Sequence, residues 1–301
     1  MQPFLPMSPI LTNTLPEGDE WLYQLKWDGF RMLAFVDNGK VELFSKKMLS
    51  KNRNYPDLIE ALKKLTGTFV LDGEAVILDP ATGRPSFQKM QQRDKLTDPA
   101  LIRRAVAREP VHYMLFDVLQ IGDEDLRGIP FRERFRRLEV LAADWKPPLY
   151  RTDLYVDAGT LWEWVTANEW EGVIAKRAGS PYREGKEHRD WFKRKRAVRL
   201  EVQAVGILFK EGRVASLVMS RDGRYFGRVS SGLNERVKRE LRGLKTGRII
   251  EDYFMGTPEG LRSAEVLWLE QPLPILVTGR EVTESGLLRH PKLMALEGMT
   301  L

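Results

Sequence analysis

Residues 26–31 read KWDGFR, a lysine followed at fixed spacing by an aspartate, a glycine and an arginine. The apolar run WLYQL precedes this motif at residues 21–25, and RMLAFV and KVELFS follow at residues 31–36 and 40–45, around the turn residues Asp37-Asn38-Gly39. Short apolar runs separated by residues that tolerate positive φ are typical of strands joined by a hairpin. We therefore expect Lys26 to end the first strand of a β-rich core.

The chain that follows alternates between helical and strand-like patterns. Residues 56–65, PDLIEALKKL, place their large apolar side chains on one helical face and end shortly before Gly67, as a helix with a glycine stop does. FVL and AVIL predict two strands that flank Asp72-Gly73-Glu74, and VHYMLFDVL at residues 111–119 predicts another. Helices are expected within residues 132–143 and 157–168, before a strand at EGVIAKR, residues 171–177.

The pattern changes after a basic run, because residues 193–199 hold five lysines and arginines in seven positions. Beyond that run the chain reads as short strands with turn residues, VQAVGILF, RVASLVMS, RYFGRVSS, VLWLE and PILVTGREVT, with one helix at residues 234–241. This change predicts two domains, residues 1–197 and 198–301. The short strands suit a small Greek-key barrel of the OB type, and a five-strand sandwich would give the same pattern.

The amino-acid composition excludes some classes of protein and of site. Lysine plus arginine outnumber aspartate plus glutamate by 48 to 42, and the net charge of +6 suits a polyanionic partner as well as an ordinary solvated surface. There are no cysteines, which excludes disulfides and thiolate metal sites, and the three histidines are scattered. No signal-peptide pattern opens the chain, and no apolar run approaches the roughly 20 residues that span a bilayer. We expect a cytoplasmic protein with no membrane partner.

Charged residues stand where the expected strands end. Glu74 lies in LDGEAV, Glu171 and Lys176 lie in EGVIAK, and Lys193 and Lys195 lie in WFKRK. Taken singly, each has an ordinary interpretation: the Asp-Gly pairs as turns, Phe116 as a core residue and the basic run as a solvated segment. The ordered set, together with the KWDGFR motif, predicts a site.

In this order, across residues 24–195, the motifs resemble those of the covalent nucleotidyltransferase superfamily of ATP-dependent DNA ligases, most closely the ligase module of bacterial non-homologous end-joining ligases. A weaker similarity extends to about Leu293. The resemblance implies an α+β fold, with an antiparallel-sheet, ATP-grasp-like nucleotidyltransferase domain over residues 1–197 and an OB-fold barrel over 198–301. It also implies a bacterial, nucleoid-associated monomer that acts on nicked or broken double-stranded DNA, with a Ku-like end-binding protein as a further partner.

The resemblance assigns a role to each motif residue. Lys26 would be the nucleophile that takes AMP from ATP, a reaction that requires an uncharged amine and therefore neighbouring cations or a metal. Glu74 and Glu171 would bind Mg²⁺ or Mn²⁺, which prefer oxygen ligands. The expected nucleotide contacts are Gln24, Leu25, Arg31, Glu74, Phe116, Lys176, Lys193 and Lys195. The expected nucleic-acid contacts are Lys46, Lys47, Arg194 and Arg196, with Lys46 standing where the family usually has arginine.

The sequence departs from the family pattern near its end. Residues 288–298, LRHPKLMALEG, begin in register with a barrel motif and then lack its Asp-Lys pair, which orients the outgoing pyrophosphate. This predicts impaired self-adenylation unless Arg289 or Lys292 substitutes. Two alternatives therefore stand beside a DNA ligase: an RNA ligase or capping-type nucleotidyltransferase, which shares the lysine motif, and a nucleic-acid-binding module that has lost catalysis.

Overall fold

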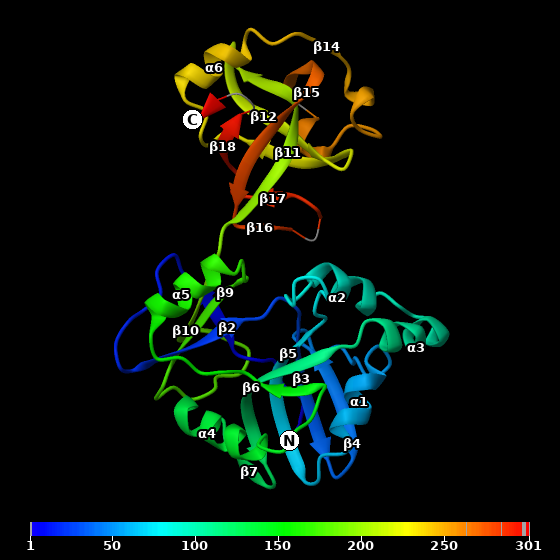
Figure 1. Cartoon of the computed structure of the whole chain (residues 1–301), viewed down its shortest axis with the longest axis vertical. Coiled ribbons are helices and arrows are strands. Elements are labelled where there is room, and N and C mark those ends of the chain that lie inside the picture. Colours follow the sequence, from blue (N-terminus) through cyan, green and yellow to red (C-terminus); the bar gives the residue numbers. More distant parts are fainter. Residues whose placement is uncertain (1, 263, 284, 297–298, 301) are drawn as a thin grey trace. The chain divides into compact units, whose positions relative to one another are not determined.

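The computed structural model describes residues 2–262, 264–283, 285–296 and 299–300. The chain divides into two compact units, Met1–Arg196 and Ala197–Leu301, which are described separately (Figure 1). None of the helices formed by the described residues combines the length and the apolar character needed to cross a bilayer.

A four-stranded sheet in the first unit carries the KWDGFR lysine. Its strand order is β1 (Ser8–Leu11), β10 (Glu187–Lys195), β9 (Gly172–Arg177) and β2 (Trp21–Lys26), with β1 parallel to β10 and the other pairs antiparallel. Helix α5 (Ala158–Ala167) covers one face, where Leu161 and Val165 pack against Val173. This packing leaves the other face of the sheet available for polar side chains, because successive side chains of a strand point to opposite faces.

The second sheet of this unit has six strands in the order β4 (Lys40–Ser45), β3 (Phe30–Asp37), β5 (Thr68–Val76), β6 (His112–Ile121) and β7 (Glu124–Asp125), with β8 (Leu149–Arg151) parallel to β6. The two strands expected around Asp72-Gly73-Glu74 are one strand, β5, so the turn interpretation of Asp72-Gly73 is wrong. A Cβ at Gly73 would lie 2.6 Å from the Tyr113 ring and 2.8 Å from the Met114 carbonyl oxygen. Glycine is therefore required there by close packing inside a sheet.

Four helices complete the first unit around this sheet: α1 (Pro56–Leu62), α2 (Phe87–Asp94), α3 (Pro99–Arg108) and α4 (Phe131–Leu141). Phe131, Phe135 and Leu138 of α4 are fully buried in the same apolar core as Leu115 and Val118 of β6. A buried ion pair also fixes α4 to β6, because Arg134 donates to both carboxylate oxygens of Asp117 at 2.8 Å and neither side chain is exposed. Removal of either partner would leave a buried charge unpaired.

The second unit is built on one sheet in the order β13 (Arg224–Val229), β12 (Arg213–Arg221), β11 (Val198–Lys210), β15 (Glu265–Gly279), β18 (Lys292–Leu296) and β19 (Met299–Thr300), with β14 (Thr246–Arg248) also on β15. A separate pair joins β16 (Glu281–Val282) and β17 (Leu288–Arg289). Helix α6 (Glu235–Leu241) and the 3₁₀ turns η1 (Ile250–Asp252) and η2 (Glu259–Leu261) lie between β13 and β15 in the chain.

One expectation for this unit is wrong and another is not confirmed. VLWLE and PILVTG are a single strand, β15, whose pairing with β11 shifts register between Ala204 and Gly206. Among the residues that the structure describes, the strand pairings do not close into a barrel. The closed OB barrel therefore stays a prediction.

Candidate active site

The centre of the site is one row of residues across the four-stranded sheet. Lys26 on β2 is paired with Gly172 on β9, which is paired with Lys195 on β10. Glu171 comes directly before this row. Its Oε2 accepts from Lys26 Nζ at 2.5 Å, and its Oε1 lies 3.2 Å from Lys195 Nζ. The three side chains are 16% to 24% exposed, so the ammonium groups and the carboxylate are partly desolvated yet open to a ligand.

Gly29 connects this row to the six-stranded sheet. A Cβ at this position would collide with the carbonyl oxygen of Ala75 on β5, so only glycine allows the segment after Lys26 to lie so close to β5. The chain then enters β3, where Arg31 stands directly opposite Glu74 of β5. The spacing of the KWDGFR motif thus places a lysine on one sheet and an arginine on the other.

Two further carboxyl groups belong to this centre. Removal from water raises the pKa of Glu74 to about 8. The charge of Lys26 opposes this shift, and the charge of the nearby Glu171 adds to it. Burial, again reinforced by Glu171, raises the pKa of Asp28 to about 6. Asp28 was expected only as part of the motif and its role was not predicted. Carboxyl groups with such perturbed pKa values are typical of functional sites.

Arg31 is held rigidly by buried partners. Its Nε and Nη2 donate to the two oxygens of Asp72 at 2.9 and 2.6 Å, and its Nη1 donates to the Met7 carbonyl at 2.6 Å. Asp72 is fully buried and also accepts from the Tyr182 hydroxyl at 2.7 Å. This carboxylate, despite the desolvation, keeps the pKa of Arg31 above its usual range, so the guanidinium is always charged.

Lys176 lies in an aromatic cage. Its ammonium is 4.5 Å from the ring centres of Phe116 and Phe131 and 4.2 Å from that of Trp191, and it donates to the Phe116 carbonyl at 3.4 Å. The side chain is only 2% exposed. Burial lowers the pKa of Lys176 to about 7, against the attraction of Asp117 and Asp72. The Arg31 guanidinium also lies 5.3 Å from the Phe116 ring centre, so two basic side chains lie against this phenylalanine.

Lys46 and Lys193 share the electrostatic field of the site. Burial and then the charge of Arg31 lower the pKa of Lys46, and burial and then the charge of Lys46 lower that of Lys193. Lys26 lowers both values further. Lys47 is exposed. The motif after β4 and the end of β10 therefore bring their ammonium groups to the same region as Lys26.

Other expected site residues do not present their side chains to this centre. Gln24 is buried and donates to the Thr152 hydroxyl at 3.0 Å, while Leu25 packs with the apolar residues under α5. The Arg194 guanidinium lies 3.6 Å from the ring centre of Trp162 in α5. Arg196 donates to main-chain carbonyls of the turn before Glu171, at Glu169 and Trp170.

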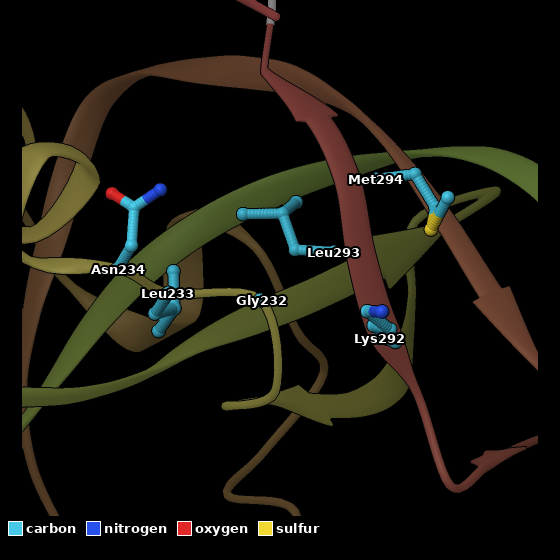
Figure 2. A pocket seen from close by; sticks show the side chains of 6 residues that line it. All are labelled: Gly232, Leu233, Asn234, Lys292, Leu293 and Met294. Carbon is cyan, nitrogen blue, oxygen red and sulfur yellow. The ribbon is translucent and has the colours of Figure 1, made fainter. Parts of the chain in front are cut away.

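A surface pocket in the second unit is lined by three residues of the altered terminal motif, Lys292, Leu293 and Met294. Gly232 and Asn234, which precede α6, also line this pocket, and Figure 2 shows the residues that surround it. The remaining lining residue is Leu233. Residues 297–298, with which the expected motif ends, lie outside the described residues.

The sequence is similar to curated DNA ligases. DNA ligase C2 of Mycolicibacterium smegmatis is 38% identical over 180 residues, which are 57% of this chain and 49% of that protein. The multifunctional non-homologous end joining DNA repair protein LigD of Mycobacterium tuberculosis is 31% identical over 290 residues, which are 91% of this chain and 36% of the relative. This chain thus spans half or less of the length of both relatives.

Solved structures and a family model agree with these relatives. The ligase domain of LigD from M. tuberculosis is 29% identical with a TM-score of 0.58, and a mycobacterial DNA ligase D complexed with ATP and MES is 30% identical with a TM-score of 0.57. Each covers 97% of this chain, which in turn covers 94% of each structure. Residues 6–195, which include every motif from Lys26 to Lys195, match the family model of the ATP dependent DNA ligase domain. The chain therefore belongs to the ATP-dependent DNA ligase domain family.

Proposed function

We propose that this chain seals nicks or breaks in DNA, joining a 3′-hydroxyl to a 5′-phosphate with ATP as the source of AMP. The observation that carries the proposal is the Glu171 carboxylate between the Lys26 and Lys195 ammonium groups, at 2.5 and 3.2 Å. A lysine nucleophile must lose a proton before it attacks, and it needs positive charge around the phosphate that it attacks. Here Glu171 provides the proton acceptor, and Lys195 provides the positive charge.

In the first step Lys26 Nζ attacks the α-phosphorus of ATP. A nitrogen–phosphorus bond forms while the bond from that phosphorus to the bridging oxygen of pyrophosphate breaks, and the pyrophosphate leaves with the electron pair. The proton of Nζ passes to Glu171 Oε2, which already accepts from it. Lys193 and Lys195 neutralise the charge that develops on the phosphate oxygens.

The nucleotide would lie between the two sheets of the first unit. We assign the adenine to a stack on Phe116, supported by the Lys176 cage, and the ribose to Arg31 and Glu74, which are paired across β3 and β5. Because the side chains of Gln24 and Leu25 point into the fold, their proposed contacts with the nucleotide use the main chain.

Glu74 and Glu171 are the residues that would hold Mg²⁺ or Mn²⁺. The described residues contain no group of three or more metal-ligating side chains, and Mg²⁺ commonly binds through one or two carboxylates together with substrate phosphates. This donor set fits a metal that binds with the nucleotide. When bound, the metal would neutralise charge on the phosphates.

In the later steps AMP moves from Lys26 to the 5′-phosphate, and the 3′-hydroxyl then displaces AMP to form the phosphodiester bond. We propose that Lys46 and Lys47 contact the DNA backbone, that the second unit is an OB-type domain, and that Lys292 or Arg289 assists departure of pyrophosphate. The DNA contacts predicted for Arg194 and Arg196 stay predictions. A monomer that acts at the bacterial nucleoid in the cytoplasm, helped by a Ku-like protein, completes the proposal.

The test is covalent labelling with α-labelled ATP and a divalent metal, followed by denaturing electrophoresis. Label is expected on the wild type and on Lys63→Ala, a control at an exposed lysine, and none on Lys26→Ala. Protein purified in the adenylated form is first discharged with pyrophosphate. Label from GTP in place of ATP would point to a capping-type enzyme, whereas discharged protein that takes up no label would leave only a nucleic-acid-binding role. Sealing of a nicked duplex with DNA or RNA at the 3′ side then separates DNA from RNA ligation.

A further inference from the structure

Arg196 holds the turn that carries Glu171 by hydrogen bonds to the main-chain carbonyls of the turn. The carbonyls of Glu169, Trp170 and Glu171 each accept a hydrogen bond from Arg196, from Nη2 at 3.3 Å, from Nε at 3.2 Å and from its backbone N–H at 2.8 Å. Glu169 has a φ of +56°, a left-handed conformation that non-glycine residues adopt only where surrounding contacts hold it. Arg196 supplies such contacts to three consecutive residues.

A tryptophan contact joins this turn to the segment of the nucleophile. The ring of Trp170 meets that of Trp27 edge to face, with ring centres 4.9 Å apart and an interplanar angle of 81°. Trp27 directly follows Lys26, and Trp170 directly precedes Glu171. The two rings therefore pack together next to the 2.5 Å contact between Lys26 and Glu171, because each ring belongs to the chain neighbour of one of these residues. Trp164 of α5 packs on Trp170 as well, with ring centres 5.5 Å apart.

We propose that Trp170 and Arg196 are positioning residues that fix the 169–171 turn, so that one carboxylate reaches both Lys26 and Lys195. This inference rests on the proposed function, since it concerns the rate at which Lys26 takes up AMP. Glu171 stands between a helix and a strand, where nothing in its own secondary structure fixes the side chain. A catalytic group displaced by about 1 Å can cost on the order of a hundredfold in rate.

The inference predicts a defect in rate and not in nucleotide affinity. In single-turnover labelling, Trp170→Ala is expected to lower the maximal rate of Lys26 adenylation about tenfold to a hundredfold, with the half-saturating ATP concentration changed less than about twofold. Trp170→Phe keeps an aromatic edge against Trp27 and should recover most of the rate. Arg196→Lys keeps the charge but loses the fork that serves two carbonyls, and should behave like Arg196→Ala.

A double-mutant cycle with Glu171→Gln separates positioning from general damage. Once the carboxylate is gone there is nothing left to position, so adding Trp170→Ala should change the remaining rate less than about twofold. Trp145→Ala is the matched control, because Trp145 is a partly buried tryptophan of the same unit that packs on the core around the six-stranded sheet. It should keep the wild-type rate.

Equal losses from Trp170→Ala in the wild-type and Glu171→Gln backgrounds would overturn the inference, as would full activity of both Arg196 variants. Should Trp170→Ala not fold, the same cycle is run with Arg196→Lys. Failure of the proposed function looks different, because discharged wild-type protein would then take up no label at Lys26 at all.

Discussion

Replacement of Lys176 by methionine removes the amino group from the aromatic cage while it keeps an unbranched side chain of similar length. The ammonium of Lys176 lies 4.2 to 4.5 Å from three ring centres, and its neighbours Asp117 and Asp72 are already paired with Arg134 and Arg31. Methionine packs well against aromatic rings. We therefore expect Lys176→Met to fold and to remove a pH dependence of stability that the wild type shows.

The size of that dependence follows from the pKa of Lys176, which burial lowers from 10.5 to about 7. Between these two values the unfolded chain holds a proton that the folded protein has lost, so the free energy of unfolding rises with pH in this window. The slope for one proton is about 1.4 kcal/mol per pH unit. Between about pH 7.5 and 9.5 the wild type should gain about 2.5 kcal/mol relative to Lys176→Met.

Urea unfolding followed by tryptophan fluorescence measures the difference, with both proteins at the same ionic strength across the pH range. Lys63→Met, which removes an exposed ammonium, is the matched control and should follow the wild type at every pH. A constant difference between the wild type and Lys176→Met across this range would show that Lys176 stays charged in the fold. The account of the cage as a desolvating site would then be wrong.

Three further predictions concern the site and its support. Because the pKa of Glu74 is raised to about 8, its carboxyl group ionises only as the pH rises through that value. The measured rate of Lys26 adenylation should therefore increase through pH 8 in the wild type, and this increase should be lost in Glu74→Gln. Gly29→Ala places a methyl group against the Ala75 carbonyl and should destabilise the protein by about 1–3 kcal/mol, measured by thermal unfolding, whereas unchanged stability would show that the backbone moves aside. Affinity for a nicked duplex should fall steeply between 50 and 200 mM salt, with the slope of log affinity against log salt reduced by about one for each of Lys46→Gln and Lys47→Gln. Binding that is flat over that range, or an unchanged slope in both variants, would contradict a backbone contact.

Local patterns were sufficient for some of the elements around the site. Lys26 was expected at the end of a strand and is the last residue of β2, and the expected helix at residues 157–168 is α5 with Asp157 as its cap. These features depend on apolar spacing and capping within a few residues, which the sequence displays directly.

Contacts between distant segments could not be read in the same way. Asp72 and Tyr182 fix Arg31 from 41 and 151 residues away, and nothing near either residue in the sequence indicates this pairing. Two strands were expected on either side of Asp72, with a turn as one interpretation because Asp-Gly is a common turn pair, whereas β5 runs straight through it. The order of motifs indicated which residues meet, but not the partners that hold them.

Strand length was a second source of error. Only Gln271, Pro272 and Leu273 lie between VLWLE and PILVTG, and two separate strands were expected there. The structure instead has one strand, β15, which continues through these residues while its partner changes. Residues 273–279 and 265–268 pair with β11, and Leu269 pairs with β14. A strand that changes partners tolerates prolines where its N–H groups are not needed.

The close backbone contacts at Gly29 and Gly172 affect how mutational scans of this chain would be interpreted. An added Cβ would strike the main-chain oxygen of Ala75 in the first case and of Arg194 in the second, and neither oxygen belongs to a flexible side chain. A mutational scan that measures ligation alone would show a loss of activity at both glycines as well as at Lys26, although neither glycine has a side chain that could take part in the reaction. A parallel measurement of protein abundance would separate the two groups, since glycine variants should be lost from both readouts and Lys26 variants from one.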